Sequence, residues 1–462
     1  MIVNDISKIN LIDKFGNLIS KQTIREDLIN INEINKSYKF KKLVFLLIEN
    51  NYESILFYIS LLKSQNTIAL INANIKTENL YELVKSYNPN TIVTKKNFEF
   101  KNYNQALTFK NYYCYENKKK TNLNINDELF FLLTTSGSTG SSKYVRISYK
   151  NLEYNTKSIV KFLKINSDDK LITTLPPDYT YGFSLLNTHL FKGSSIVLNN
   201  YSIIQREFWE LLKKTKATTF GGVPYTYELL KKIHFENYSF PSLKYLTQAG
   251  GKLSNENQKY FYKILKKKKI KLIIMYGATE ATSRMSYLPW KFCQKKIGSI
   301  GIPIPGTKME INNPDKNKIG EIIFKGKNVS LGYAKSYKDL SRGNLNKEKL
   351  NTGDIGYKDE DGFYFIVGRK KRFLKLLGHR INLDELEINL RKLLNHNLIF
   401  CTGNDNELII ISNQDKIKNQ IFSSIVKEYK INKTLVKFKK FTNLSLTSSN
   451  KINYKKLDEN SK

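Results

Sequence analysis

The chain has few of the residues that build disulfide frameworks, metal clusters or membrane spans. Its 462 residues include three cysteines and four histidines, all scattered along the sequence. This spacing excludes both a disulfide framework and a clustered zinc site. The apolar runs are short, as in Leu43–Ile48, and none predicts a membrane span. The segment Met1–Asp5 lacks the basic and apolar parts of a secretory signal, so we predict a cytoplasmic protein.

Acidic residues are scarce beside basic ones. Asp and Glu number 41 against 76 Lys and Arg, for a formal net charge of +35. Such a charge is typical of nucleic-acid-binding proteins. The lysines are spread along the whole chain, however, and the densest runs, 118–120 and 266–269, fall at expected element ends. We therefore expect no nucleic-acid partner, and a basic surface that attracts anionic ligands and acidic partners.

The composition is that of a folded protein, with 40% hydrophobic and 12% aromatic residues. Helical and strand patterns alternate through residues 43–95 and again after the polar loop at 134–143. The next predicted helix spans 150–163, with Ser148 as its N-terminal cap. From about residue 298 the chain becomes rich in glycine and in strand patterns. This order indicates an α/β fold.

A domain boundary is predicted near residue 368. Beyond it a compact β/α pattern follows, in which one helical stripe is apolar: Leu386, Leu390, Leu393 and Leu394. We predict a large N-terminal domain of several subdomains, residues 1–368, and a small α+β domain, residues 369–462.

The loop at 134–143 lies between strand-like runs at 129–133 and 144–148. It contains seven hydroxyl residues, two glycines and one lysine, in the order Thr134, Thr135, Ser136, Gly137, Ser138, Thr139, Gly140, Ser141, Ser142, Lys143. Free backbone N–H groups, hydroxyls and an ammonium are suited to a polyphosphate. A flexible Ser/Gly linker is the alternative, which the flanking strands disfavour. The loop is not a P-loop, because glycine does not immediately precede Lys143.

Four other segments carry candidate polar residues. In Tyr276–Glu280, which follows a predicted strand, the Glu280 carboxylate suits Mg²⁺ or belongs to an ordinary turn. Asp354 stands between two glycines, where it accepts from vicinal ribose hydroxyls or caps a turn. Four consecutive cations, residues 369–372, follow Gly368, and Lys451 lies in a polar turn near the C-terminus.

Together and in this order, the segments resemble the AMP-forming adenylating superfamily of acyl-CoA synthetases, carrier-protein adenylation domains and luciferases. The resemblance covers about residues 40–457 and implies ATP and Mg²⁺ as cofactors. By this resemblance the loop 134–143 holds the β- and γ-phosphates of ATP. Residues flanking the adenine would be Gly250, Gly251, Tyr276 and Gly277.

The same resemblance implies further roles. Thr279 and Glu280 meet the α-phosphate and Mg²⁺, and Asp354 with Arg369 binds the ribose. Lys451 bridges the substrate carboxylate and the α-phosphate, and the small domain rotates about a hinge at Lys371. The acid pocket would be lined by Tyr181, Gly182, Gly222 and Val223. Two departures are Asn450 for the usual glycine before Lys451, and Lys371 with Arg372 for an acidic pair.

The implied activity is an AMP-forming ligase. It converts a carboxylic acid and ATP to an acyl-adenylate plus pyrophosphate, then transfers the acyl group to CoA or to the phosphopantetheine of an acidic carrier protein in trans. An alternative is an amino-acid-activating ligase that loads a stand-alone carrier. Asp178 lies outside the register for pairing with an α-ammonium, which favours an acid without one. A non-enzymatic nucleic-acid-binding or degenerate adenylating protein is disfavoured by the five retained segments.

Overall fold

The computed structural model describes residues 2, 5–32, 40–119, 121–134, 143–376, 379–396, 398–404, 406–429, 431–445 and 452–461. The chain divides into two compact units. The N-terminal unit comprises Met1–Lys308 and Lys325–Leu350, and the C-terminal unit comprises Met309–Phe324 and Asn351–Lys462. Each unit is described separately below.

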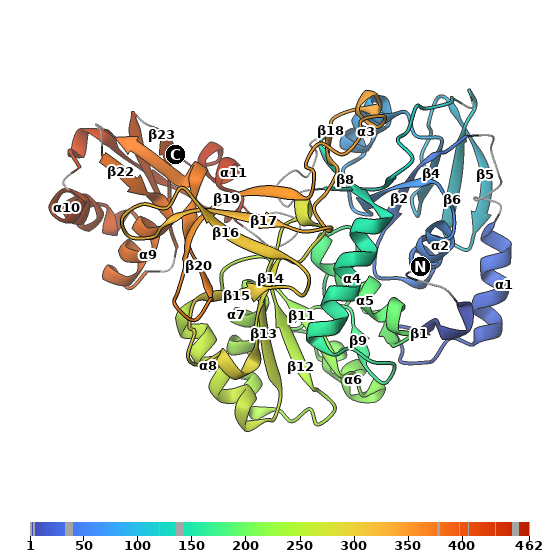
Figure 1. Cartoon of the computed structure of the whole chain (residues 1–462), viewed down its shortest axis with the longest axis horizontal. Helices are drawn as coiled ribbons and strands as arrows, with labels where there is room; N and C mark the ends of the chain where they lie inside the picture. The colour runs from blue at the N-terminus through green and yellow to red at the C-terminus, as the bar shows by residue number, and fades with distance from the viewer. Residues whose placement is uncertain are drawn as a thin grey trace. The chain divides into compact units, whose positions relative to one another are not determined.

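One sheet of the N-terminal unit has a parallel centre. Strands β7, β3, β2 and β4 are parallel neighbours, and antiparallel strands extend the sheet on both sides (Figure 1). In sheet order the strands are β18 (Gly332–Ala334), β8 (Tyr144–Ser148), β7 (Leu129–Thr134), β3 (Thr67–Asn72), β2 (Leu43–Ile48), β4 (Thr91–Thr94), β6 (Tyr112–Asn117) and β5 (Tyr103–Phe109). Because successive side chains alternate between faces, Val44 and Leu46 pack in a different cluster from Leu43 and Phe45.

A second sheet of the same unit carries the candidate site. It is parallel from β1 to β13, and β14 and β15 continue it antiparallel. The order is β1 (Asn10–Ile12), β10 (Ser195–Val197), β9 (Lys170–Ile172), β11 (Thr219–Gly222), β12 (Tyr245–Gln248), β13 (Lys271–Tyr276), β14 (Ser286–Leu288) and β15 (Ser299–Pro303). All parallel strands therefore end at the same edge.

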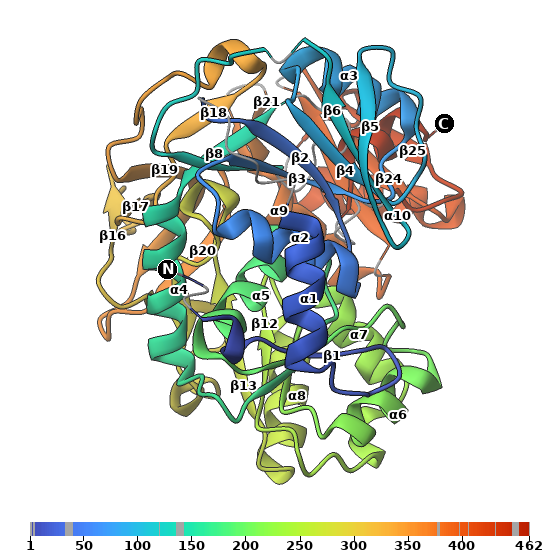
Figure 2. The ribbon, with the colours of Figure 1, turned by 90° about the vertical axis from the view of Figure 1, so that its right-hand side faces the viewer.

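Eight α-helices accompany these sheets in the described part of the unit. They are α1 (Lys21–Ile31), α2 (Tyr52–Leu62), α3 (Thr77–Tyr87), α4 (Tyr149–Leu163), α5 (Thr180–Lys192), α6 (Arg206–Thr215), α7 (Pro224–Lys232) and α8 (Asn255–Lys267). Helix α1 lies beside α2 (Figure 2). Helices α2 and α3 pack in the two different clusters of the first sheet, so they cover its opposite faces.

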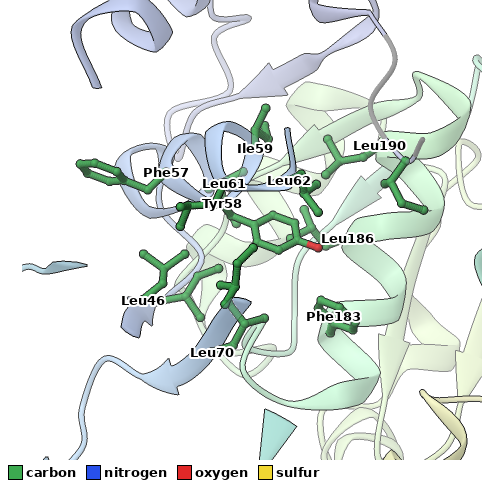
Figure 3. Close-up of a cluster of buried hydrophobic side chains, with 14 of the residues drawn as sticks. Leu46, Phe57, Tyr58, Ile59, Leu61, Leu62, Leu70, Phe183, Leu186 and Leu190 are labelled. Atoms are coloured by element: carbon green, nitrogen blue, oxygen red, sulfur yellow. The ribbon is translucent and has the colours of Figure 1, made fainter. Parts of the chain in front are cut away.

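The main core joins α2 and α5 with strands of both sheets. Tyr58 of α2 packs against Phe183 of α5 with ring centroids 6.2 Å apart (Figure 3). The Tyr58 hydroxyl donates to Asn187 Oδ1 at 2.7 Å. Leu186 and Leu190 continue the contact along α5. Helix α2 is apolar on nearly every side because protein surrounds it. This packing holds the N-terminus of α5 in place beside the second sheet.

The described part of the C-terminal unit contains three sets of neighbouring strands. The first has the order β20 (Tyr364–Arg369), β19 (Lys349–Lys358), β17 (Gly320–Lys325) and β16 (Lys308–Asn312). The second pairs β21 (Phe373–Leu376) with β22 (His379–Asn382), and the third has the order β23 (Ile399–Asn404), β24 (Glu407–Ser412) and β25 (Val436–Lys440). Helices α9 (Leu383–Leu393) and α10 (Lys418–Tyr429) share one core with this third sheet, and α11 (Tyr454–Glu459) packs in another.

Most local predictions are confirmed. Ser148 caps α4, accepting from the Asn151 N–H at 3.0 Å while the Asn151 side chain accepts from the Ser148 N–H at 2.9 Å. The apolar stripe of α9 was wrong at one position, because Leu393 is 54% exposed while Leu386 and Leu390 are buried. The domain boundary at residue 368 and the hinge at Lys371 stay predictions. Among the described residues, no helix combines the length and apolarity needed to cross a membrane.

Candidate active site

Three glycine-bearing segments lie at the carboxyl edge of the second sheet. β11 ends at Gly222, β12 leads into Ala249–Gly251, and β13 ends at Tyr276 before Gly277. These strands are parallel neighbours in register, so the three segments meet at one edge. Ligands of open α/β sheets bind outside the carboxyl ends of the strands.

Two of these glycines are required by close backbone packing. A Cβ on Gly277 would lie 1.6 Å from the carbonyl oxygen of Ser283. Gly250 has φ +83°, and a Cβ there would lie 2.3 Å from the Tyr179 hydroxyl. Side chains at these positions would displace the loops that follow β12 and β13. Gly250 and Gly277, two of the three glycines predicted to flank the adenine, thus belong to a tightly packed edge.

Thr279 brings three distant segments together. It begins the 3₁₀ helix η4 (Thr279–Ala281), three residues after the end of β13 at Tyr276. Its hydroxyl is 2.7 Å from the hydroxyl of Thr180, the first residue of α5. It also donates to the carbonyl of Thr134 at 3.5 Å, at the start of the predicted phosphate loop. Residues 135–142 of that loop, with Thr135, Ser136, Gly137, Ser138, Thr139 and Gly140, lie outside the described residues.

Lys143 and Glu280 converge on Tyr333, a residue that the sequence analysis missed. The Tyr333 hydroxyl donates to Glu280 Oε1 at 2.7 Å. The Lys143 ammonium lies 3.6 Å from the centroid of the Tyr333 ring. Burial and the neighbouring Glu280 raise the pKa of Tyr333, so its phenol remains a donor at neutral pH. Tyr333 comes from β18, which pairs with β8 directly after Lys143.

The predicted acid-lining residues Tyr181, Gly182, Gly222 and Val223 are all buried in the N-terminal unit. The Tyr181 hydroxyl donates to Thr247 Oγ1 of β12 at 2.8 Å, and burial raises the pKa of Tyr181 to about 12. A Cβ on Gly221 would lie 3.0 Å from the same hydroxyl. The first turn of α5 therefore packs against β11 and β12.

Asp178, just before α5, is buried and has an amide as its partner. The Asn72 Nδ2 lies 3.3 Å and 3.1 Å from its two carboxylate oxygens. Burial raises the pKa of Asp178 to about 6, and the Asn72 hydrogen bonds oppose that rise. The side-chain partner of the Asp178 carboxylate is thus an uncharged amide, that of Asn72.

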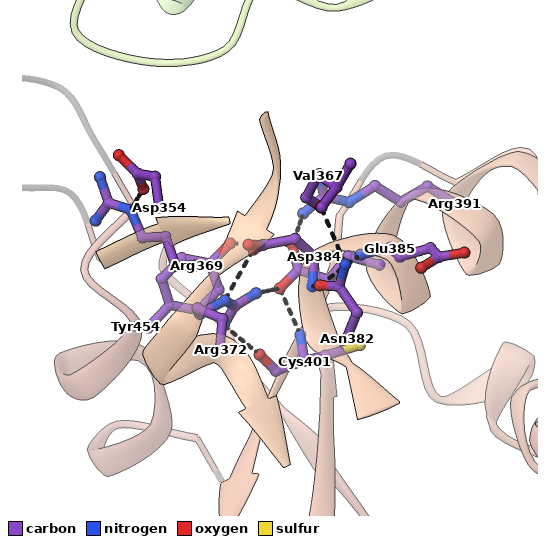
Figure 4. Close-up of polar contacts among 11 residues, drawn as sticks. Asp354, Val367, Arg369, Arg372, Asn382, Asp384, Glu385, Arg391, Cys401 and Tyr454 are labelled. Carbon is purple, nitrogen blue, oxygen red and sulfur yellow. Dashed lines mark hydrogen bonds and ion pairs between the residues drawn. The ribbon is translucent and has the colours of Figure 1, made fainter. Parts of the chain in front are cut away.

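Asp354 and Arg369 face each other in the C-terminal unit. They are cross-strand partners on β19 and β20, and Arg369 Nε donates to Asp354 Oδ1 at 3.1 Å (Figure 4). The Asp354 side chain is buried, whereas that of Arg369 is largely exposed. The predicted ribose-binding pair is thus held side by side. Lys371 lies in the 3₁₀ helix η7 (Lys370–Arg372), and Lys451 lies outside the described residues.

A buried ionic cluster follows the predicted hinge position. Arg372 donates to Asp384 at 2.8 Å and to Glu387 at 2.6 Å, and its guanidinium lies 4.1 Å from the Tyr454 ring centroid (Figure 4). The Tyr454 hydroxyl donates to Glu387 Oε2 at 3.0 Å. Arg372, which replaces an acidic residue of the family pattern, therefore anchors the start of α11, three residues after Lys451.

Sequence comparison supports this reading of the N-terminal unit. The family model described as AMP-binding enzyme matches residues 35–334. A 2-succinylbenzoate–CoA ligase of Listeria monocytogenes is 29% identical over 256 residues, which cover 55% of this chain and 52% of the relative. A probable 4-coumarate–CoA ligase 1 of Dictyostelium discoideum is 32% identical over 266 residues, with coverages of 55% and 47%. The chain spans about half the length of the curated relatives that it matches.

Solved structures share the fold over nearly the whole chain. An O-succinylbenzoate coenzyme A synthetase (MenE) from Bacillus subtilis, in complex with AMP, superposes with a TM-score of 0.76 at 19% identity, covering 97% of this chain and 95% of that one. ATP-bound MatB from Rhodopseudomonas palustris gives a TM-score of 0.74 at 18% identity, with coverages of 99% and 96%. The predicted α/β class, with a large N-terminal and a small C-terminal domain, is confirmed. The chain belongs to the AMP-binding enzyme family.

Proposed function

We propose that the chain is an AMP-forming acid–thiol ligase. It activates a carboxylic acid with ATP and transfers the acyl group of the acyl-adenylate to a thiol. The observation that carries the proposal is the convergence of Thr134 and Lys143, the ends of the hydroxyl-rich loop, with Thr279 and Glu280. The relatives named as CoA ligases support the same activity.

Candidate ATP-binding residues are proposed in each unit. The loop 134–143 takes the β- and γ-phosphates, and the Gly250–Gly251 and Tyr276–Gly277 segments flank the adenine. Asp354 accepts from the ribose hydroxyls, with Arg369 as its partner. The position of the glycine segments at the carboxyl ends of parallel strands supports this assignment.

Glu280 is the proposed Mg²⁺ ligand. Mg²⁺ is usually held by one or two carboxylates together with substrate phosphates. One carboxylate beside the Thr279 hydroxyl fits that donor set, and no group of three or more His, Cys, Asp or Glu suited to a metal gathers among the described residues. A MenE structure from Bacillus subtilis contains ATP and a magnesium ion. When bound, the ion neutralises phosphate charge.

The first half-reaction joins two anions. A carboxylate oxygen of the acid attacks the α-phosphorus, the bond to the β-phosphate oxygen breaks, and pyrophosphate leaves. This step requires positioned cations rather than a strong base. Lys451 is assigned to bridge the acid carboxylate and the α-phosphate. One such lysine stabilises the transition state by about 3–4 kcal/mol, or roughly 10²–10³ in rate.

In the second half-reaction the thiol sulfur attacks the acyl carbon, and AMP leaves. Rotation of the C-terminal domain about Lys371 is proposed to exchange Lys451 for the thiol. The acceptor is CoA or the phosphopantetheine of an acidic carrier protein, and the formal charge of +35 suits either anion. Because ATP and CoA are cytoplasmic metabolites, we assign the activity to the cytoplasm.

ATP–pyrophosphate exchange tests the proposal. The full chain is assayed with fatty, aryl, hydroxy and amino acids, and CoA or a holo carrier protein is then added. We expect exchange with a carboxylic acid and thioester formation with one acceptor. Exchange with amino acids alone would instead identify an amino-acid-activating ligase, and no exchange with any acid would refute the proposal.

Lys451→Ala tests the catalytic assignment. The variant is expected to lose exchange activity by roughly 10²–10³, because the other groups cannot replace its charge at the α-phosphate. Lys456→Ala, which removes an exposed lysine five positions further on, is the matched control and should retain the wild-type rate. Near-normal exchange by a folded Lys451→Ala protein would exclude the assigned role.

A further inference from the structure

Arg284 is a buried arginine at the edge of the candidate site in the N-terminal unit. It lies between η4 and β14 and is 3% exposed. Its backbone is fixed, because its carbonyl accepts from Asn155 Nδ2 at 2.9 Å and from Asn328 Nδ2 at 3.0 Å. The side chain therefore starts from a well-defined position.

The guanidinium is only partly paired by protein groups. Nη1 donates to Ser283 Oγ at 2.7 Å, and Cζ lies 4.1 Å from the centroid of the Tyr181 ring. Nε and Nη2 are buried and have no hydrogen-bond partner in the described part of the chain. These two nitrogens form the side-on edge that binds both oxygens of one carboxylate. No described carboxylate pairs with these two nitrogens, and burial lowers the pKa of the Arg284 guanidinium.

Arg146 shows how the same unit pairs a structural arginine. It is completely buried and its guanidinium donates to four backbone carbonyls, those of Leu331, Tyr333, Arg342 and Gly343. In Arg284 only Nη1 is paired, with the carbonyl oxygen of Ser283 at 3.4 Å and its Oγ at 2.7 Å, whereas Nε and Nη2 lack such partners among the described residues although the side chain is also buried. A water molecule would satisfy an N–H group but would leave the buried charge uncompensated. Nε and Nη2 of Arg284 are therefore suited to bind an anionic group of a ligand.

The neighbours of Arg284 connect it to residues proposed to bind the acid and to a residue proposed to bind the α-phosphate of ATP. Tyr181, on which it stacks, is a predicted acid-lining residue at the start of α5. Ser283 Oγ, which accepts from Arg284, donates to the carbonyl of Thr180 at 3.1 Å. The Thr180 hydroxyl in turn is 2.7 Å from that of Thr279, the residue assigned to the α-phosphate. The contacts therefore run from Thr279, which is assigned to the α-phosphate, to the Arg284 guanidinium beside the acid-lining residue Tyr181.

We propose that Arg284 determines substrate specificity by binding a second carboxylate, so that the enzyme activates dicarboxylic acids. This inference rests on the proposed ligase function and names its substrate class. One carboxylate of the acid reacts with ATP, and the other pairs with Nε and Nη2 of Arg284. A monocarboxylic acid of equal length leaves that edge unpaired, and sites of this kind discriminate strongly against the analogue that lacks the polar group.

The wild-type chain provides the first test, with no substitution needed. ATP–pyrophosphate exchange is measured on the matched pairs butyrate and succinate, valerate and glutarate, and hexanoate and adipate. We expect kcat/KM for the dicarboxylate to exceed its partner by roughly 100-fold or more in at least one pair. Preference for the monocarboxylate in every pair overturns the role of Arg284 but leaves the ligase function intact. Exchange with no acid overturns both.

Two variants identify the residue responsible. Arg284→Leu should bring the dicarboxylate-to-monocarboxylate ratio of kcat/KM close to 1, and Arg284→Lys, which keeps the charge without the fork, should give an intermediate ratio. A merely structural role would lower both rates and leave the ratio unchanged, as expected for Arg146→Leu. If the anion were instead an ATP phosphate, Arg284→Leu would weaken ATP binding in the absence of acid. Either of these results would contradict the proposal.

Discussion

Replacing Asp178 with asparagine is expected to stabilise the N-terminal unit at neutral pH. The Asp178 carboxyl is 6% exposed, and its hydrogen-bond partner is the uncharged Asn72 amide. Burial raises its pKa from 3.8 to about 6. The folded state therefore holds the proton more tightly than the unfolded state does. The contribution of the protonated Asp178 carboxyl to the free energy of unfolding is fully present below pH 3.8 and is lost as the pH rises through about 6.

The size of the effect follows from the shift. The rise in the pKa of Asp178 from 3.8 to about 6 destabilises the folded state by about 3 kcal/mol at pH 7.5, where the carboxyl is ionised in both the folded and the unfolded state. At pH 5 the folded state keeps most of its proton, and the penalty falls to about 1.6 kcal/mol. Asparagine has the same shape and does not titrate. Asp178→Asn should therefore raise the free energy of unfolding by about 3 kcal/mol at pH 7.5 and by about half as much at pH 5.

Urea denaturation followed by tryptophan fluorescence measures this difference. Both tryptophans, Trp209 and Trp290, lie in the N-terminal unit and report its unfolding. Asp168→Asn, which neutralises an exposed carboxylate ten positions earlier in the chain, is the matched control and should show no pH-dependent gain. An Asp178→Asn protein that is no more stable than wild type at pH 7.5, or whose gain is independent of pH, would refute the reasoning.

Two further substitutions test contacts that the sequence analysis missed. Tyr333→Phe keeps the ring beneath Lys143 but removes the hydrogen bond to Glu280, so we expect the exchange rate to fall about tenfold at an unchanged melting temperature. A rate equal to wild type would show that Glu280 is positioned by other groups. Glu387→Gln leaves Arg372 and Arg391 without their shared carboxylate and should destabilise α9 by about 3–5 kcal/mol, measured by amide hydrogen exchange. Unchanged protection of α9 would contradict this estimate.

Much of the fold could be predicted because its signals are local. The strand expected at 144–148 and the capping hydroxyl of Ser148 depend on neighbours within a few positions, and both predictions are confirmed. The error at Leu393 has a tertiary cause. An apolar residue in register with Leu386 and Leu390 becomes buried only if another element covers it, and the helix period does not reveal where that cover ends.

In the candidate site, too, the local features can be predicted from the sequence and the long-range contacts cannot. Its glycine and hydroxyl segments are recognisable in the sequence, since each is a short run with its own composition, and their order along the chain indicates the family. The contacts between them are not readable there. Glu280 is 53 residues from Tyr333, and Thr279 is 99 residues from Thr180. The order of the parallel strands and the pairing of β18 with β8 bring these residues together.

Arg284 is the clearest example of a candidate site residue that the sequence alone does not reveal. In a chain with 76 Lys and Arg residues, one more arginine carries no signal. Burial and hydrogen-bond partners separate it from the rest, and both are properties of the packed fold. The amino-acid pattern therefore determines the family, because the family's motifs are short runs of neighbouring residues. Packing determines which buried side chains lack a protein partner, because those partners come from distant parts of the chain.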